Sequence, residues 1–161
     1  LEYLNELNEL TDEQKSFCQG IGKEFVKLLE STNMTKVYKM PVLMAFYNHG
    51  DVRMKVTETE LLVSWKEFFS VGANWKDLDT GITYEQYCKI SDKDHIKTII
   101  KMPVNFLMRS GKGFFVKKED SVLALRDEMK EIIKNPVLAE QMKDVIEYRA
   151  MAYYQRRYKE Q

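Results

Sequence analysis

Seven basic side chains lie between residues 93 and 118, against a single acid, Asp94. Basic residues at this density can contact the phosphates of a nucleic acid and release its condensed counterions, so binding would weaken with salt. Three of them are spaced by four and would share one face of a helix. The set predicts a nucleic-acid surface; the alternative is a solvated face that keeps a small domain soluble. Its members are Lys93, Lys97, Lys101, Arg109, Lys112, Lys117 and Lys118.

The same stretch offers two side chains that suit base edges. The Asn105 amide suits adenine and the Arg109 guanidinium suits guanine. One candidate of each kind favours contacts with the DNA backbone over readout of a base sequence. His95 lies in the same stretch, and we expect it either at the solvated surface or in contact with phosphate.

The motifs of a reaction centre are missing from the sequence. Gly22-Lys23 and Gly111-Lys112 lack the upstream glycine and the following Ser or Thr of a phosphate-binding loop. The two histidines have neither metal-site nor triad spacing, and His49, beside Gly50, is expected to end a helix, where the dipole favours it. We therefore expect no catalytic residue and no cofactor.

The two cysteines, Cys18 and Cys88, have no Cys or His neighbour at the spacing of a zinc site, so no metal is expected. Two reduced, partly buried thiols are the simpler interpretation. No apolar run reaches the roughly 18 residues of a membrane span, and the chain shows no secretory signal pattern. We expect no membrane partner and a location in the reducing cytoplasm.

The chain has 161 residues, 44% of them hydrophobic, enough for one well-buried domain or two small helical subdomains with a shared interface. Its 25 basic and 25 acidic residues cancel, so only their local distribution can indicate a polyanion partner. Residues 1–13 are acidic and carry no base. Because the chain begins at Leu1 within what reads as an amphipathic helix, we expect it to be a piece of a longer polypeptide.

Apolar residues recur at helical spacing through residues 2–30, which predicts an N-terminal helical arm over residues 1–32. Thr11 with Gln14 resembles a capping box. It would divide the arm into a short acidic helix and a second helix from about 12 to 31.

A four-residue repeat is present in the sequence, because Lys39-Met40-Pro41-Val42 recurs as Lys101-Met102-Pro103-Val104. Each copy continues through an apolar stretch to a glycine, Gly50 or Gly111. Proline suits the first turn of a helix, and glycine suits the position past its end. Each copy therefore predicts a compact helix, and shared capping chemistry explains the match better than a duplication does.

The central part follows the order of a winged helix. Residues 52–56 alternate apolar and basic side chains, which predicts a short strand. Thr57 and Glu60 have capping-box spacing and would open a helix that runs through Ser70. Residues 71–90 are rich in turn signals, include a short helix, and would form an insertion.

The next two elements would be the recognition helix and the wing. Asp92 can cap a helix through about Ile100, and Pro103 starts or kinks the segment that follows. Residues 113–125 read as a β-hairpin, in which two short apolar runs are joined by a charged turn.

The last two predicted elements are a helix over residues 126–134 and a long helix over residues 137–158. The end of the long helix interleaves tyrosine with arginine, a pattern that suits both single-stranded bases and protein interfaces. Packing against the rest of a parent protein is the favoured interpretation. The predicted interface consists of Tyr148, Arg149, Tyr153, Tyr154, Arg156 and Arg157.

Together these elements predict a mainly α fold with a small β component. A winged-helix-like core, with helices and a β-hairpin wing, would occupy residues 33–134 and contain the insertion at about 71–90. The N-terminal arm would precede it, and a long C-terminal helix would follow over residues 135–161.

Four segments together resemble a C-terminal accessory domain of bacterial superfamily-2 helicases of the DEAD/DEAH type. They are MTKVYKMPVL at 34–43, DHIK at 94–97, FLMRSGKGFF at 106–115 and DVIEYR at 144–149, and the resemblance covers most of residues 12–158. It implies a parent protein with ATP-dependent DNA translocation in restriction or repair. The motor motifs are absent from this chain, so ATP binding and hydrolysis would belong to the motor domains of the parent.

The resemblance and the basic set together predict a non-catalytic domain that holds duplex or forked DNA, largely without sequence specificity, while the parent motor acts. The main alternative is a protein-interaction or scaffolding domain of the same parent, with the acidic arm and the Tyr/Arg helix as contact surfaces. A third is a standalone winged-helix transcriptional regulator, which would have to dimerise to present two recognition helices.

Overall fold

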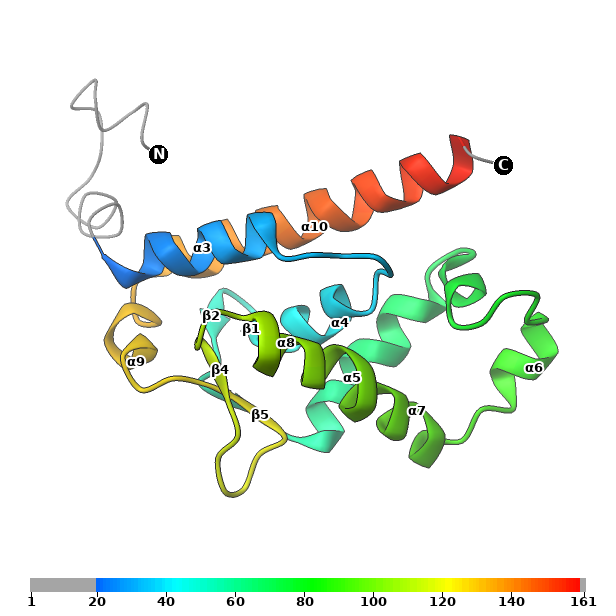
Figure 1. The fold of residues 1–161 in the computed structure, drawn as a ribbon, viewed down its shortest axis with the longest axis horizontal. Helices are drawn as coiled ribbons and strands as arrows, with labels where there is room; N and C mark the ends of the chain where they lie inside the picture. The colour runs from blue at the N-terminus through cyan, green and yellow to red at the C-terminus, as the bar shows by residue number, and fades with distance from the viewer. Residues whose placement is uncertain (1–19, 160–161) are drawn as a thin grey trace.

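A computed structural model of the chain describes residues 20–159, in which helices predominate and strands are short (Figure 1). This agrees with the predicted mainly α fold with a small β component. The predictions for residues 1–19, including the Thr11 capping box and the environment of Cys18, lie outside the described residues.

The described elements follow the predicted order with some changes of length. The helices are α3 (Ile21–Ser31), α4 (Lys39–Met44), α5 (Glu58–Ser70), α6 (Tyr84–Cys88), α7 (Asp92–Ile99), α8 (Asn105–Ser110), α9 (Met129–Ile132) and α10 (Pro136–Lys159), with a 3-10 turn η1 (Asn74–Asp77) and a π turn η2 (Ile100–Val104). The strands are β1 (Tyr47–Asn48), β2 (Asp51–Val52), β3 (Lys55–Val56), β4 (Phe115–Val116) and β5 (Leu123–Leu125).

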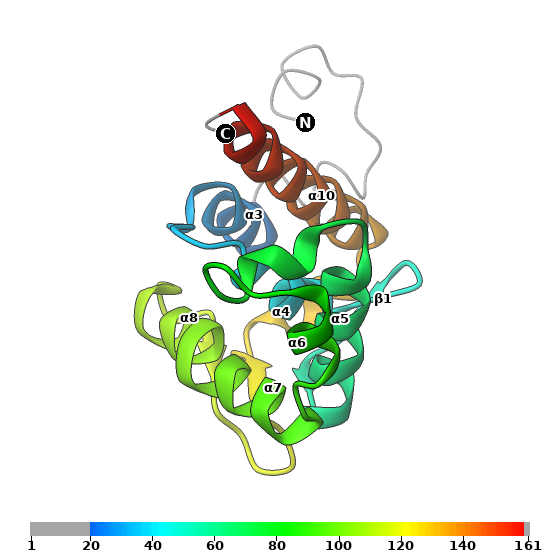
Figure 2. The ribbon, with the colours of Figure 1, turned by 90° about the vertical axis from the view of Figure 1, so that its right-hand side faces the viewer.

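Helices α3 and α10 lie side by side along one side of the molecule (Figures 1 and 2). Helix α4 packs beneath α10 and against α5. Helix α7 and the loop between β4 and β5 lie on the side away from α10 (Figures 1 and 2), and α8 packs against β4. The part of the basic stretch on α7 and on that loop therefore lies on the far side of the molecule from the long C-terminal helix.

The strands form two small antiparallel sheets. One is the β1–β2 hairpin, and the other has the order β3-β5-β4. The predicted strand over residues 52–56 is split, because Val52 pairs with Tyr47 in the first sheet and Val56 pairs with Leu123 in the second. The hairpin predicted over residues 113–125 is present as β4 and β5, with Val116 opposite Ala124.

The turn of the β1–β2 hairpin corrects the prediction for His49. His49 and Gly50 both have positive φ, 49° and 94°, which is the backbone of the two-residue turn that matches the twist of a hairpin. Helix α4 has already ended at Met44. His49 is therefore an exposed turn residue, and Gly50 serves the hairpin rather than a helix end.

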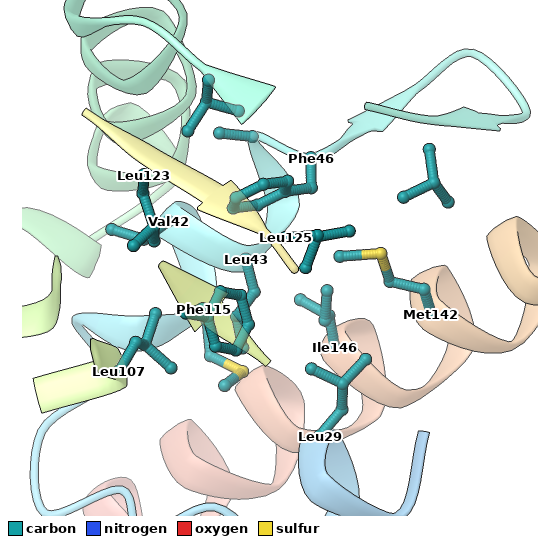
Figure 3. Close-up of a cluster of buried hydrophobic side chains, with 14 of the residues drawn as sticks. Leu29, Val42, Leu43, Phe46, Leu107, Phe115, Leu123, Leu125, Met142 and Ile146 are labelled. Carbon is teal, nitrogen blue, oxygen red and sulfur yellow. The ribbon is translucent and has the colours of Figure 1, made fainter. Parts of the chain in front are cut away.

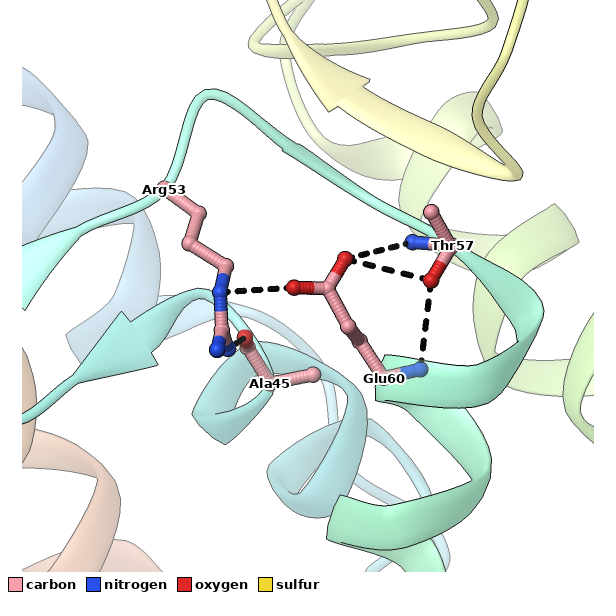
Figure 4. Close-up of polar contacts among 4 residues, drawn as sticks. All are labelled: Ala45, Arg53, Thr57 and Glu60. Carbon is pink, nitrogen blue, oxygen red and sulfur yellow. Dashed lines mark hydrogen bonds and ion pairs between the residues drawn. The ribbon is translucent and has the colours of Figure 1, made fainter.

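The predicted capping box at the start of α5 is present (Figure 4). The Thr57 N–H donates to Glu60 Oε1 at 3.0 Å, and the Glu60 N–H donates to Thr57 Oγ1 at 3.3 Å. Glu60 Oε2 also lies 2.8 Å from Arg53 Nε, and Arg53 Nη1 donates to the Ala45 carbonyl at 2.7 Å. The cap thus joins α5 to the β2–β3 segment and to the end of α4.

One hydrophobic core joins elements from both ends of the described chain (Figure 3). Leu29 of α3 and Ile146 of α10 belong to the same cluster as Leu43, Phe115 and Leu125. The segment predicted as a core at 33–134 therefore shares its interior with α3 and α10. This sharing makes α10 a structural part of the fold, and it begins and ends close to its predicted bounds.

The predicted helix over residues 126–134 is much shorter in the structure, where only Met129–Ile132 are helical. The residues around it form hydrogen-bonded turns, such as Lys130 N–H to the Asp127 carbonyl and Asn135 N–H to the Ile132 carbonyl. Asn135 Oδ1 then accepts a hydrogen bond from the Val137 N–H at 3.0 Å and caps the start of α10.

Candidate nucleic-acid surface

The basic stretch is built on a nearly continuous helix formed by α7, η2 and α8. Ser91 caps its start, because the Ser91 hydroxyl oxygen accepts a hydrogen bond from the Asp94 N–H at 3.1 Å. Asp92, the predicted cap, is instead the first helical residue, where its charge suits the positive end of the helix dipole.

Two rows of residues, each spaced by four, run along this helix. The inner row consists of His95, Ile99, Pro103 and Leu107, and all of these side chains are buried. The outer row is offset by two positions and consists of Lys93, Lys97, Lys101, Asn105 and Arg109, which are exposed except for the half-buried Asn105. The predicted basic residues of the helix therefore share the face that points away from the core.

The π turn reduces the winding of these two rows around the helix. In a regular α-helix a row spaced by four turns by about 40° with every step and winds around the helix. The wider turn over Ile100–Val104 slows that rotation. Pro103 explains its position, because proline has no N–H and its ring would clash with the Ile99 carbonyl in a regular helix. The second Lys-Met-Pro-Val copy is thus a π turn inside a helix rather than a helix start, and the predicted compact helix that ends before Gly111 is present as α8.

Glycine shapes the passage from α8 to the wing. A Cβ atom at Gly111 would lie 2.3 Å from the Leu107 carbonyl oxygen and 2.7 Å from the Phe115 ring, so no larger residue fits there without a backbone shift. Lys112 and Gly113 follow with φ of 51° and 80°. This tight reversal places the exposed Lys112 at the end of the helix, directly before β4.

The wing supplies two lysines that differ in their surroundings. Lys117 is exposed, whereas Lys118 is half-buried and its ammonium donates to the Asp127 carboxylate. This hydrogen bond and the charge of Lys118 lower the pKa of Asp127. The other six members of the basic set have no ion-pair partner among residues 20–159.

Apolar side chains are exposed on the same helix. Ile100, Phe106 and Met108 are between 36% and 43% exposed. Phe106 and Met102 line a pocket of about 550 Å³ between α8 and the segment that leads into α4. The pocket also involves the end of the outer row, since Arg109 is one of its lining residues.

His95 corrects a prediction, because it is 4% exposed and belongs to the core side of the helix. Its Nδ1 accepts a hydrogen bond from Trp65 Nε1 at 3.1 Å, and its ring lies 6.1 Å from that of Tyr87. Burial, and next the charge of Lys66, lower the pKa of His95. A buried, neutral imidazole that accepts from an indole is a packing element and cannot reach a phosphate.

The predicted C-terminal interface is divided by the structure. Arg149 faces inward, where its Nη1 donates to the carbonyls of Leu29 at 3.0 Å and Thr32 at 2.6 Å and so completes the end of α3. Tyr153 and Tyr154 are half-buried against the core. Only Tyr148 and Arg156 of the described members are exposed, and the side chain of Arg157 lies outside the described residues.

Sequence reasoning also placed Cys88 incorrectly, because it is exposed at the end of α6 rather than partly buried. Within residues 20–159, no three His, Cys, Asp or Glu side chains are arranged to hold a metal ion. None of the helices in that range is both long enough and apolar enough to cross a membrane.

Comparison of the chain with protein-family models, curated proteins and solved structures gave no match. The resemblance to helicase C-terminal domains therefore stays a prediction from the sequence. The outer row, the wing and the adjoining pocket are the features of the described chain on which a function can be argued.

Proposed function

We propose that this chain is a non-catalytic DNA-binding domain that holds DNA through its phosphate backbone. The outer row carries the proposal, because Lys93, Lys97, Lys101 and Arg109 lie on one exposed face without an acid partner in the described part of the chain. Such cations neutralise phosphates and release counterions, which gives binding that depends on salt and little on base sequence.

The connectivity of the central elements supports the proposal. Helix α4, strand β3, helix α5, the α7–α8 helix and the β4–β5 hairpin follow one another in the order of a winged helix, with α6 inserted. In that interpretation the α7–α8 helix would be the recognition helix, and Lys117 would extend the contact along the wing. Asn105 is half-buried, which leaves Arg109 as the better placed of the two candidates for a base edge.

The sequence resemblance places this activity in a larger protein. The parent would be a helicase-like ATPase, and its motor domains would supply ATP hydrolysis and translocation. The present chain would keep the DNA in place through its basic face while the motor moves.

Fluorescence anisotropy of labelled duplex DNA at low and near-physiological salt tests the proposal. The variant Lys97→Glu/Lys101→Glu reverses two charges of the outer row, and Lys130→Glu/Lys143→Glu makes the same charge change at exposed positions on α9 and α10. The first variant should bind weakly. The magnitude of its negative slope of log K against log salt should fall by about two, because two phosphate contacts are lost. The second should bind like the wild type. Equal losses in both variants, or no wild-type binding at low salt, would contradict the proposal.

The alternative of a protein-interaction domain has one observation in its favour. Tyr148 is 65% exposed and Met151 is 53% exposed, and both belong to α10, the helix that lies across the molecule from α7 (Figures 1 and 2). Large apolar side chains at a surface are typical of interfaces. A Tyr148→Ala/Met151→Ala variant that loses binding to the parent's motor domains but retains DNA binding would assign this face to assembly.

A further inference from the structure

The pocket beside α8 combines positive charge with an apolar wall. Its wall is formed by Tyr38, Met102 and Phe106, and its cations are Lys36, Lys39 and Arg109. No carboxylate lines it among the described residues. An occupant that complements this lining has a negative charge next to a flat or apolar group.

Lys39 places a buried positive charge at the pocket, and no negative charge of the described residues compensates it. Its side chain is 7% exposed, and its ammonium donates to Thr32 Oγ1 at 3.0 Å and to the Asn33 carbonyl at 2.6 Å. These contacts use two of its three N–H donors and bring no negative charge. Burial, together with the charge of Arg149, lowers the pKa of Lys39. An anion in the pocket would offset this buried charge.

Phe106 gives the pocket a surface for an aromatic ring. It is 43% exposed in the free chain although it is a large apolar residue. Bases of single-stranded nucleic acid stack on such side chains, whereas a base inside a duplex is already stacked on its neighbours. The volume of about 550 Å³ accommodates one nucleotide.

Arg109 connects the pocket to the outer row, because it belongs to both. A DNA backbone that follows Lys93, Lys97 and Lys101 along the helix arrives at the mouth of the pocket. This continuity favours a nucleic-acid occupant over an acidic peptide, which would match the charge alone.

We propose that the pocket receives an unpaired nucleotide at the junction of double- and single-stranded DNA, with the base against Phe106 and Met102 and a phosphate near the three lining cations, Lys36, Lys39 and Arg109. The proposal rests on the proposed DNA-binding function and adds a preference for forked over fully paired DNA. The duplex arm would lie on the outer row, and one single strand would leave it past Arg109.

The test compares labelled duplex DNA with the same duplex carrying two single-stranded arms, in wild type, Phe106→Ala and Met108→Ala. Met108 is a matched control, because it is an exposed apolar residue of the same helix that does not line the pocket. Loss of one base–aromatic stack corresponds to a drop in affinity of roughly 5- to 150-fold. Phe106→Ala should lose this much for forked DNA and bind duplex like the wild type, and Met108→Ala should bind both like the wild type. Circular dichroism of each variant establishes that it is folded.

The other outcomes separate the two proposals. Wild-type binding to duplex without a preference for forks, or a Phe106→Ala variant that keeps the preference, overturns the pocket proposal alone. Wild type that binds neither DNA overturns the proposed function as well. If an acidic peptide with an aromatic residue binds wild type but not Phe106→Ala, and forked DNA shows no such difference, the occupant is a protein segment.

Discussion

The two copies of Lys-Met-Pro-Val have the same residues but differ in burial at the lysine and the methionine, whereas the proline and the valine are buried in both. In the first copy, at residues 39–42, all four side chains are buried and the proline lies in the first turn of α4. In the second copy Lys101 is exposed, Met102 is half-buried, and Pro103 forms the π turn in the middle of a helix. The copies nevertheless meet, because Lys39 and Met102 line the same pocket.

This difference shows that the role of a basic or apolar side chain depends on which face of its helix meets the core. Lys39 completes the turn that leads into α4, whereas Lys101 remains available for a partner. The same difference, between a side chain engaged within the fold and an exposed one, distinguishes Arg149 from Arg156, His95 from the neighbouring lysines, and Lys118 from Lys117. The arginine pair and the lysine pair can each be tested by the same substitution at the engaged and at the exposed member, and His95 can be tested by itself.

The largest expected effect is on the methionines of the two copies. Met40 is fully buried, so Met40→Ala should lower the free energy of unfolding by about 2–5 kcal/mol, through lost burial and the cavity that remains. Met102→Ala should cost clearly less, because Met102 is already half-exposed. Urea unfolding followed by circular dichroism measures both. Equal costs would mean that the copies are equally buried in solution.

The arginines of α10 should show the next largest difference. Arg149→Ala removes two hydrogen bonds from a charged group to the carbonyls at the end of α3, and should cost about 1.5–3 kcal/mol. Arg156→Ala at an exposed position should change stability by about 0.5 kcal/mol or less. Comparison of the two urea midpoints checks this. If Arg149→Ala left the free energy of unfolding unchanged, Arg149 would not stabilise the end of α3 and would again be a candidate for the predicted interface.

The pH dependence of stability should be reduced by a substitution at His95. The pKa of His95 in the folded chain lies below its ordinary value of 6.5, so below pH 6.5 the unfolded chain takes up a proton that the folded chain does not. Stability present above pH 6.5 is therefore lost as the pH falls. His95→Gln retains an acceptor for Trp65 and should show a smaller loss between pH 7.5 and 5.5 in urea unfolding. The same loss in both proteins would mean that other groups are responsible.

The smallest expected effect concerns the two lysines of the wing. Lys117→Ala should reduce the magnitude of the slope of log K against log salt by about one, because an exposed ammonium is lost from the DNA-binding surface. Lys118→Ala should leave the slope nearly unchanged, because its ammonium is already engaged by Asp127. Anisotropy titrations at several salt concentrations distinguish them. Equal slopes would mean that the Lys118 pair opens when DNA binds.

Local signals were predicted well. The Thr57 capping box, the β4–β5 hairpin and the extent of α10 follow from short-range spacing, and each is present in the structure. The wrong predictions concern local patterns that are compatible with two different structures. His49-Gly50 suits both a helix end and a hairpin turn, and packing selected the hairpin. His95 lies among lysines in the sequence, which favoured an exposed position. It is two positions away from the outer row along the helix and therefore faces the core, where it accepts a hydrogen bond from Trp65.

The sequence by itself determined the mainly α class, the capping box of α5, and the placement of basic residues at every fourth position from Lys93 to Lys101. These depend on contacts within a few residues, which the order of the chain specifies directly. The tertiary structure alone decided that Lys39 is buried, that Arg149 donates to the carbonyls at the end of α3, that Lys118 is paired, and that Lys36, Phe106 and Arg109 line one pocket. Those outcomes depend on which distant segments exclude water from one another, and spacing along the chain does not encode that.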